Sequence, residues 1–244
     1  MHGLIDIHCH LVPGVDDGSD TMAESMQLLR MEYQEHVSVV IVTPHYRKGL
    51  FETPQSKIQA AIKAMRLQAR EEGIRVRIYS GCEYHSRSKM VDDLNNKKRP
   101  TLVGTPYVLT EFSGSDSYNL IRKQIYDLIV AGYRPIIAHV ERYNALTKNA
   151  VLIQDLINLG AEIQITSGSL LGDFGRPTRK FCLNLMDEHR VHYIASDAHN
   201  TIDRIPNLGT CADFVEKKFG IEYARQLFLE NPGKIIAGKK KIRI

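Results

Sequence analysis

Histidines and carboxylates recur at short spacings along this 244-residue chain. His8 and His10 stand two positions apart near its start, and Asp197 and His199 repeat that spacing far downstream. Imidazole nitrogens and carboxylate oxygens are donors that suit Mn²⁺, Fe²⁺ and Zn²⁺. Clustered ions of this kind activate water for the hydrolysis of phosphate esters. The spacing therefore predicts a metal-dependent phosphohydrolase, if the fold brings these distant residues together.

Further residues of the same types stand between these two pairs, each just beyond a short apolar run. The full set is His8, His10, Asp16 or Asp17, His45, Glu83, Glu111, His139, Asp197 and His199. Nine such side chains in one pocket would repel one another and resist burial unless cations compensated them. They exceed what one ion with an open position can use, so two or three ions are predicted. The donor types do not decide among Mn²⁺, Fe²⁺ and Zn²⁺.

The elements that must position these residues follow a regular alternation of β-branched runs and amphipathic stretches. Strands are expected at residues 4–7, 37–43, 76–79, 107–110, 136–138, 162–165 and 193–195. Helices are expected at residues 21–35, 54–72, 118–131, 149–159, 179–189, 207–219 and 221–229, the last ending before Asn231 and Pro232. This alternation predicts an α/β fold, a distorted (β/α)7 barrel of the TIM type, formed by residues 1–244 as a single domain.

In a parallel barrel the carboxyl ends of all strands face the same way, and active sites lie at that end. Residues about 190 positions apart are thereby carried into one pocket. Side chains at i and i+2 of a strand share a side, so His8 and His10 can both face the barrel axis while Cys9 turns outward. We expect the active site at the carboxyl ends of the strands.

Arginines near these histidines are candidates for binding the substrate phosphate, because guanidinium groups make forked contacts with phosphate oxygens. Arg142 follows His139 by three positions, and Arg204 follows His199 by five. Arg47, just after His45, and Arg176, in the glycine-bounded loop at 172–177, are weaker candidates. Ser167 to Ser169 and this loop are expected to form part of the rim or a lid.

Composition excludes several other classes of protein. The net charge of +4 reflects in part the tail Lys239, Lys240, Lys241 and Arg243, which we expect to be solvated, so no nucleic-acid groove is predicted. No apolar run approaches the roughly 20 residues that span a bilayer, so no integral membrane segment is expected. Four scattered cysteines indicate a reducing cytoplasm. None of them is followed six positions later by arginine, which excludes cysteine-based phosphatase chemistry.

Several longer motifs carry a resemblance to a known family. They are IDIHCHLVPGVDDGS, VTPHYRKGLFETP, GCEY, LTEF, IIAHVERY, QITSGSLLG and ASDAHN. Together they resemble the PHP (polymerase and histidinol phosphatase) superfamily. More narrowly, they are similar to the manganese-dependent protein tyrosine phosphatases of capsule and exopolysaccharide operons in Gram-positive bacteria. The similarity extends over essentially the whole chain.

The resemblance implies a centre of three divalent ions, most often Mn²⁺. It places His8, His10, Glu83 and Asp197 on one ion, and makes Glu83 a bridge to a second ion held by Glu111 and His139. It places Asp17, His45 and His199 on the third, with Asp17 chosen over Asp16 by motif alignment alone. Arg142 and Arg204 match the family's phosphate-contacting arginines. We predict that Arg142, Arg204 and His45 serve catalysis, and that Arg142, Arg204 and Arg47 bind substrate.

The resemblance also implies the substrate: the phosphorylated, tyrosine-rich tail of a cognate bacterial tyrosine autokinase, whose dephosphorylation regulates polysaccharide export. A cytoplasmic enzyme recruited by that kinase to the inner face of the membrane is expected. The alternative is a small-molecule phosphatase of the same superfamily, such as one acting on histidinol phosphate. A catalytically silent metal-binding module and an amidohydrolase are further rivals, although Glu83 and Glu111 stand where an amidohydrolase wants a bridging lysine.

Overall fold

A computed structural model describes residues 1–241 of the chain, with side chains described as far as Gly238. The basic tail that we expected to be solvated, at Lys239, Lys240, Lys241 and Arg243, therefore lies outside the described side chains. Within the described chain, no helix combines the length and apolarity that crossing a bilayer requires.

All seven expected runs form strands, and two of them continue as short second strands. The strands are β1 (Leu4–Cys9), β2 (Val37–Val42), β3 (His45–Tyr46), β4 (Arg77–Ser80), β5 (Glu83–His85), β6 (Tyr107–Glu111), β7 (Arg134–Ile137), β8 (Glu162–Thr166) and β9 (Tyr193–Ala195). Every pairing between these named strands is parallel. The predicted α/β architecture is thereby confirmed.

The two interrupted strands break next to candidate ligands. Pro44, which has no N–H to donate to a ladder, separates β2 from β3 and stands directly before His45. Gly81 and Cys82 separate β4 from β5, which begins at Glu83. A Cβ on Gly81 would lie 2.8 Å from a Leu102 methyl carbon, so only glycine fits there without a shift. Both breaks change the direction of the chain just before a side chain that faces the strand-end pocket.

Helices connect the strands and cover the outside of the sheet. They are α1 (Met22–Gln34), α2 (Gln55–Glu71), α3 (Met90–Asn95), η1 (Leu102–Gly104), α4 (Tyr118–Val130), η2 (Val140–Arg142), α5 (Asn144–Thr147), α6 (Val151–Leu159), α7 (Ser167–Leu171), α8 (Arg176–Asp187), α9 (Leu208–Phe219), α10 (Ile221–Arg225), η3 (Gln226–Glu230) and α11 (Asn231–Lys241). The expected helices between strands all form. The rim expected at Ser167 to Ser169 is itself helical, as α7.

The prediction that the last helix stops before Asn231 and Pro232 is wrong. Helical structure continues from α10 through the π-helical turn η3 into α11, which begins at Asn231 and contains Pro232 in its first turn. Proline is tolerated in a first turn because the N–H groups there have no intrahelical acceptor. The wider π turn just before it relaxes the ladder where the proline ring enters.

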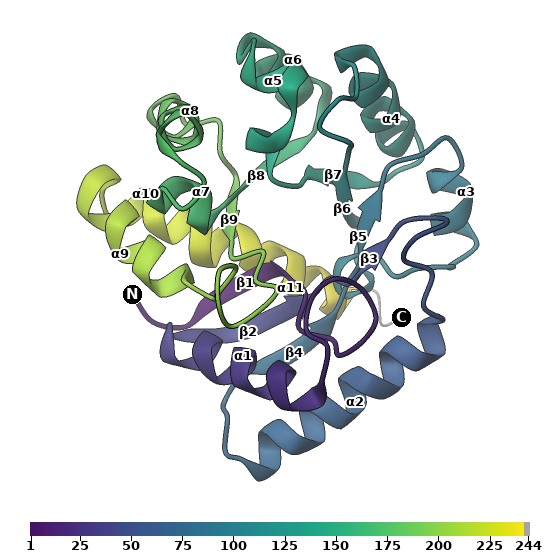
Figure 1. Cartoon of the computed structure of the whole chain (residues 1–244). Helices are drawn as coiled ribbons and strands as arrows, with labels where there is room; N and C mark the ends of the chain where they lie inside the picture. Colours follow the sequence, from purple (N-terminus) through teal and green to yellow (C-terminus); the bar gives the residue numbers. More distant parts are fainter. Residues whose placement is uncertain (242–244) are drawn as a thin grey trace.

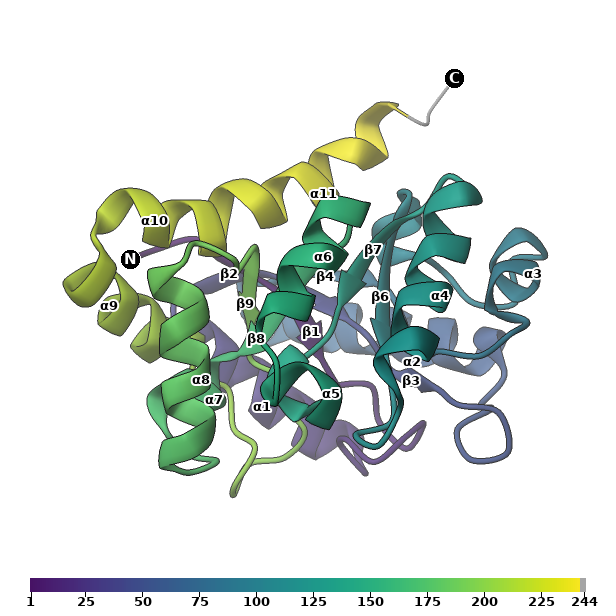
Figure 2. The same cartoon turned by 90° about the horizontal axis from the view of Figure 1, so that it is seen from above.

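The strands curl into a distorted barrel (Figure 1). Two sheets, ordered β1-β2-β4 and β3-β5-β6-β7-β8-β9, share the ring. The ring closes where β1 meets the chain beyond β9, since His10 N–H donates to the Ala198 carbonyl at 2.8 Å. Inside, Ile7, Ile41 and Leu109 pack with Ile235 of α11, which crosses one side of the barrel (Figure 2). The opposite, carboxyl end is thus left for polar residues.

Candidate metal centre

The strand ends bring four of the predicted ligands into contact at the base of the pocket. His8 and His10, both on β1 or directly after it, have Nε2 atoms 3.2 Å apart, as the i and i+2 argument requires. The same His8 atom lies 3.1 Å from Glu83 Oε2 and 3.2 Å from Asp197 Oδ1. All four side chains are buried. Their donor atoms lie close enough together to hold one ion.

The remaining five predicted ligands join the same network. His45 spans it: its Nε2 lies 3.4 Å from Asp17, and its Nδ1 lies 3.1 Å from Glu83 and 3.2 Å from Glu111. His199 Nε2 lies 3.6 Å from the same Asp17 oxygen. His139 Nε2 contacts Glu83 Oε1 at 2.7 Å. The geometry therefore groups His45 with Glu83 and Glu111 as well as with Asp17 and His199, whereas His139 touches Glu83.

Four of the five imidazoles are anchored through Nδ1 and present Nε2 to the centre. Their Nδ1 atoms contact Gln164 Oε1 at 3.2 Å from His8, Asp16 Oδ2 at 2.8 Å from His10, Tyr143 Oη at 3.2 Å from His139 and the Asp197 carbonyl at 2.8 Å from His199. Three of these partners only accept hydrogen bonds, so Nδ1 must carry the proton. The Nε2 lone pair is then free for a cation, which is how metal-binding histidines are usually held.

Asp16 and Asp17, which sequence alone could not separate, have different positions. Asp16 is buried and accepts hydrogen bonds from His10 Nδ1 and from the main-chain N–H of His45 at 2.9 Å. Burial opposes its ionisation, but the charge on His10 and the hydrogen bonds from His10 and His45 together outweigh it and lower the pKa of Asp16 to about 2. Asp17 is half exposed and faces His45 and His199. The geometry favours Asp17 as a ligand and Asp16 as the group that orients His10.

Two of these residues hold uncommon backbone conformations. His139 and Asp197 both have positive φ, at 32° and 54°. A left-handed conformation in a residue other than glycine costs of order 1–3 kcal/mol and tends to occur at functional sites. Here it turns the chain sharply at the ends of β7 and β9, so that the His139 ring and the Asp197 carboxylate point back into the pocket.

The polar atoms of the centre fit bound cations. Four of them are buried without a hydrogen-bond partner in the described structure: His45 Nδ1, Glu83 Oε2, Asp197 Oδ1 and His199 Nε2. Orphaned buried polar atoms are rare and each calls for an explanation. Each belongs to a residue in one of the groups whose ligand atoms could hold an ion, and divalent ions bound there would satisfy them.

Without bound ions, protonated imidazoles balance the negative charge of the buried carboxylates. Burial would raise the pKa of Glu83, but the charges on His8 and His45 hold that pKa well below its usual range. Burial likewise opposes ionisation of Asp197, and Arg142 and His8 outweigh it and lower its pKa. Burial disfavours protonation of His8 and His45, yet Glu83 in particular raises their pKa values to about 9 and about 10. The site therefore requires positive charge from some source.

Two predicted arginines reach the centre. Arg142 Nη2 and Arg204 Nη2 donate to the same oxygen, Asp197 Oδ2, at 2.6 and 2.7 Å. Each uses one nitrogen on Asp197 and keeps further N–H donors for a ligand. Arg47 and Arg176 are exposed, and within the described chain no hydrogen bond or ion pair joins their side chains to the centre. Substrate binding by Arg47 stays a prediction without a contact to support it.

Three residues that support the centre were not predicted from the sequence. Gln164 accepts hydrogen bonds from His8 and from the main-chain N–H of His139, and Tyr143 contacts the His139 ring. Asp16 was considered only as a ligand. A buried glutamine within the apolar run of β8 was the one visible signal. Tyr143 ends the IIAHVERY motif but lies outside the expected helices and strands, so its type and position alone did not indicate a contact with His139.

A parallel barrel with a His and carboxylate cluster at its carboxyl end defines this chain as a metal-dependent hydrolase of the TIM-like class. The chain belongs to the family described as capsular polysaccharide synthesis, CpsB/CapC, whose model matches residues 4–237. The predicted resemblance to capsule-associated, metal-dependent tyrosine phosphatases is thereby confirmed.

Individual relatives agree with this assignment. Tyrosine-protein phosphatase CpsB of Streptococcus pneumoniae is 36% identical over 238 residues, covering 96% of this chain and 98% of the relative. Tyrosine-protein phosphatase YwqE of Bacillus subtilis is 33% identical, covering 90% and 86%. A crystal structure from a study of YwqE and S. pneumoniae CpsB, described as metal-dependent tyrosine phosphatases, superimposes with a TM-score of 0.91 at 32% identity, covering 97% of this chain and 95% of that one.

A substitution at Gly18, with one at Gly233 as its control, tests how the loop that carries Asp16 and Asp17 is held. A Cβ on Gly18 would lie 2.2 Å from the His10 carbonyl oxygen, so Gly18→Ala must push the loop away from His10. Gly233, in α11, has nothing within 4 Å of its added Cβ, and Gly233→Ala should be neutral or stabilise by up to about 1 kcal/mol. We expect Gly18→Ala to weaken Mn²⁺ binding at least tenfold by isothermal titration calorimetry. Equal affinities in both variants would contradict the proposed position of the loop.

The raised histidine pKa values predict a pH-dependent response to metal. For the ion-free protein, stability from His8 and His45 is fully present below about pH 6.5 and is lost as pH rises through about 9 to 10. Ligand imidazoles must be deprotonated, so metal binding strengthens over the same range. We expect the increase in Tm caused by Mn²⁺ to grow from pH 6.5 to 8.5 in thermal melts. An increase that shrinks with pH would contradict this balance.

Proposed function

We propose that this chain is a metal-dependent protein tyrosine phosphatase that acts in capsular or exopolysaccharide synthesis. The observation that supports this most directly is the single network of five imidazoles and four carboxylates, His8, His10, Asp17, His45, Glu83, Glu111, His139, Asp197 and His199, with two arginines at its edge. The relatives that match over nearly their whole length are tyrosine phosphatases. The family model covers residues 4–237, which supports a single phosphatase domain over residues 1–244.

In this proposal the nine residues hold three divalent ions, with Mn²⁺ most consistent with the resemblance and Fe²⁺ or Zn²⁺ also compatible with the donors. Such ions, when bound, lower the pKa of water and neutralise charge on a phosphate group. Glu83 lies between the His8, His10 and Asp197 group and the His45 and Glu111 group, and so serves as the bridge. Arg142 and Arg204, fixed on Asp197, direct their free N–H groups at the phosphate oxygens.

His45 is assigned to catalysis because its ring lies at the open side of the network. Its side chain is 12% exposed, whereas His8, His10, His139 and His199 are almost fully covered. A metal ligand at the mouth of the pocket would stand next to the phosphate that the bound ions receive. The leaving phenolate, with a pKa of about 10, needs little help from a general acid.

Exposed apolar side chains on three loops favour an aromatic substrate. Phe174 is 46% exposed, and the Arg142 guanidinium carbon lies 5.6 Å from its ring centroid. Leu50, 61% exposed, adjoins Phe51, whose ring stacks parallel to His45. Ile202, 88% exposed, lies between His199 and Arg204. We infer that these residues contact the phenyl ring of phosphotyrosine while the arginines take its phosphate.

Cysteine-based chemistry has no support from the site. Cys9, Cys82, Cys182 and Cys211 are all buried and unpaired, and burial raises the pKa of each thiol. A nucleophilic cysteine needs a lowered pKa and access to substrate. Four unbonded cysteines are also consistent with the proposed cytoplasmic location.

We propose that the physiological substrate is the phosphorylated tail of a tyrosine kinase, which would bring the enzyme to the inner face of the membrane.

Metal removal and one ligand substitution test the proposed activity. With a phosphotyrosine peptide as substrate, we expect chelation of divalent ions and His139→Ala each to lower kcat/KM at least about 100-fold, because each removes part of the metal centre. His2→Ala, an exposed histidine away from the site, is the matched control and should leave the rate unchanged. Circular dichroism should show that the His139→Ala variant remains folded. Equal turnover in all samples would exclude the mechanism.

The same assay separates the two candidate substrate classes. We expect kcat/KM for the phosphotyrosine peptide to exceed that for histidinol phosphate at least tenfold at equal metal loading, because the apolar side chains at the rim suit a phenyl ring. The reverse order of rates would assign the chain to small-molecule phosphatases of the same superfamily.

Phe174→Ala tests the aromatic contact directly. An aromatic pair contributes about 0.5–1.5 kcal/mol beyond area burial, which corresponds to roughly 2- to 10-fold in affinity. We expect Ki for phenylphosphonate to rise by that factor and Ki for methylphosphonate to stay constant. Tyr126→Ala, an exposed aromatic on α4, is the control. An equal rise for both inhibitors would mean that Phe174 acts only by supporting Arg142.

A further inference from the structure

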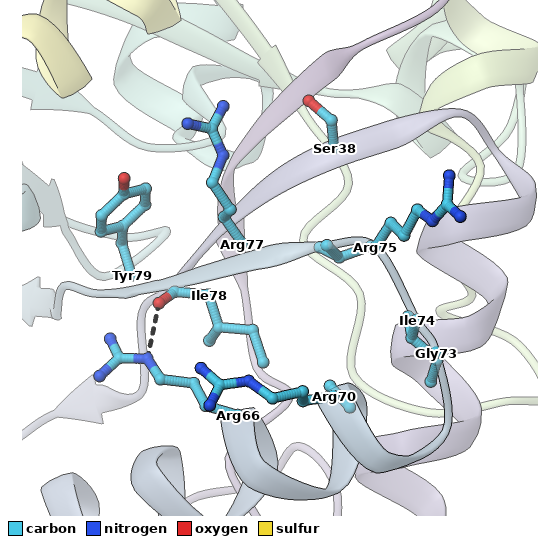
Figure 3. A pocket seen from close by; sticks show the side chains of 11 residues that line it. Ser38, Arg66, Arg70, Gly73, Ile74, Arg75, Arg77, Ile78 and Tyr79 are labelled. Atoms are coloured by element: carbon cyan, nitrogen blue, oxygen red, sulfur yellow. Dashed lines mark hydrogen bonds between the residues drawn. The ribbon is translucent and has the colours of Figure 1, made fainter.

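A second cavity, of about 750 Å³, lies between α2 and β4, away from the carboxyl ends of the strands (Figure 3). Arg66 and Arg70 border it from the last turns of α2, and Arg75 and Arg77 border it from β4 and the residues just before it. Ser38 of β2 and Ile78 of β4 also contribute to its lining. We call this cavity the α2–β4 groove. None of its lining residues belongs to the metal centre.

The four arginines of the α2–β4 groove carry uncompensated charge. All four are exposed, and none forms an ion pair within the described part of the chain. Other exposed arginines, such as Arg30, Arg122 and Arg134, each contact a carboxylate. Residues 63–77 contain five basic side chains against two acidic ones, a net charge of +3. One of the two, Glu72, is already paired with Arg30 at 2.5 Å. An anionic ligand would supply the missing charge.

The arrangement of the guanidinium groups suits an extended ligand. Figure 3 shows Arg66 and Arg70 on the helix side of β4, with Arg75 and Arg77 projecting from the strand away from that helix, so the four groups are widely separated around the strand. A single phosphate could contact only part of this set. A neighbouring hollow of about 530 Å³ shares Arg66 and Arg70 and adds Lys63 and the exposed Leu67. Together they form a continuous basic path with an apolar side chain beside it.

The adjoining strand favours a polypeptide over other polyanions. β4 pairs with β2 alone, so among the described residues its second edge meets no strand. The Ile78 carbonyl instead accepts a hydrogen bond from Arg66 Nε at 2.9 Å, inside the groove. A strand paired on one side can exchange main-chain hydrogen bonds with an added extended peptide. A second copy of this chain is disfavoured, because joining through this face would bring two sets of four arginines together.

We propose that the α2–β4 groove binds an extended acidic segment of a protein substrate, remote from the phosphotyrosine that the metal centre hydrolyses. This proposal rests on the proposed function only in naming the partner as the phosphatase substrate. The charge and the strand edge of the groove would bind an extended acidic segment of any protein. Because Arg77 precedes Glu83 by six positions, at most about 20 Å separates the two residues. The groove lies at the start of β4 and the centre lies beyond its end, so a substrate chain would pass around the outside of the barrel to occupy both.

Direct binding tests the groove without any catalysis. The probe is a fluorescein-labelled octaglutamate peptide without phosphotyrosine, measured by anisotropy. We expect Arg70→Glu combined with Arg77→Glu to weaken binding at least tenfold. The matched control, Lys217→Glu with Lys218→Glu at the exposed end of α9, makes the same change in net charge and should alter Kd less than twofold. Equal weakening in both double variants, or in neither, would overturn the proposal.

A kinetic experiment then tests whether the groove and the metal centre bind the same substrate chain. Two substrates are compared: a short phosphotyrosine peptide, and the same peptide joined to octaglutamate through twelve Gly and Ser residues, a linker of roughly 20 Å root-mean-square length. For wild type we expect KM to be at least threefold lower with the extension. The Arg70→Glu and Arg77→Glu variant should lose that advantage but keep wild-type turnover of the short peptide. No effect of the extension on wild type would overturn the substrate role.

These outcomes are separable from failure of the proposed function. Absence of phosphatase activity with groove-dependent octaglutamate binding would contradict the function and leave the peptide site standing. The converse would leave the phosphatase standing and remove the groove. A single-stranded oligothymidylate probe completes the design. If it binds more tightly than octaglutamate and with the same sensitivity to Arg70 and Arg77, the groove is a nucleic-acid site and the peptide proposal fails.

Discussion

The burial of two carboxylates, Glu83 and Asp197, is the constraint on which the rest of the centre depends. Both are almost inaccessible to solvent, and an uncompensated buried carboxylate would protonate or destabilise the fold. Imidazole and guanidinium groups around the two carboxylates supply the compensating positive charge. His8, His10, His45 and His139 contact Glu83, while Arg142 and Arg204 contact Asp197. Imidazoles serve this purpose well because they can carry a proton or offer a lone pair to a metal ion.

Anchoring of the outer imidazole nitrogens converts this charge requirement into a defined geometry. With Nδ1 of His8, His10 and His199 bound to acceptors, the rings cannot turn away or exchange tautomers freely. Backbone irregularity completes the arrangement, since the strands break at Pro44 and Gly81 and the chain turns sharply at His139 and Asp197. Regular strands would point alternate side chains outward. The breaks let consecutive strand ends all face one pocket.

Much of this fold was predictable because its signals are local and periodic. All seven apolar runs form strands, and the spacing of His8 and His10 correctly predicts that both rings face the same side. The short strands β3 and β5 were not predicted, because two or three residues give no periodic signal. The helix through Pro232 was missed because a first-turn proline and a breaking proline look alike until the register of the helix is known.

The residues of the site were likewise predictable where local sequence identifies them, and not where distant contacts decide their roles. Residue type and position at strand ends suffice to collect the nine predicted ligands. The distinct positions of Asp16 and Asp17 depend on how a loop folds over His10, and the role of Gln164 depends on its contact with His8, 156 positions away. Such orienting contacts are set by three-dimensional packing, for which one sequence carries little signal.

Two sets of arginines, one at the metal centre and one in the α2–β4 groove, differ in whether a carboxylate already neutralises them. Arg142 and Arg204 are held on Asp197, so their direction is fixed and their field acts over a short range, where a phosphate sits during reaction. Arg70, Arg75 and Arg77 have no acidic partner among the described residues and face solvent, where their attraction for anions extends about one Debye length, near 8 Å at physiological salt. Fixed arginines suit catalysis, and unpaired ones suit capture. A protein substrate that carries both a phosphotyrosine and an acidic segment would use the two sets at once, which gives a physical reason for both to occur on one chain.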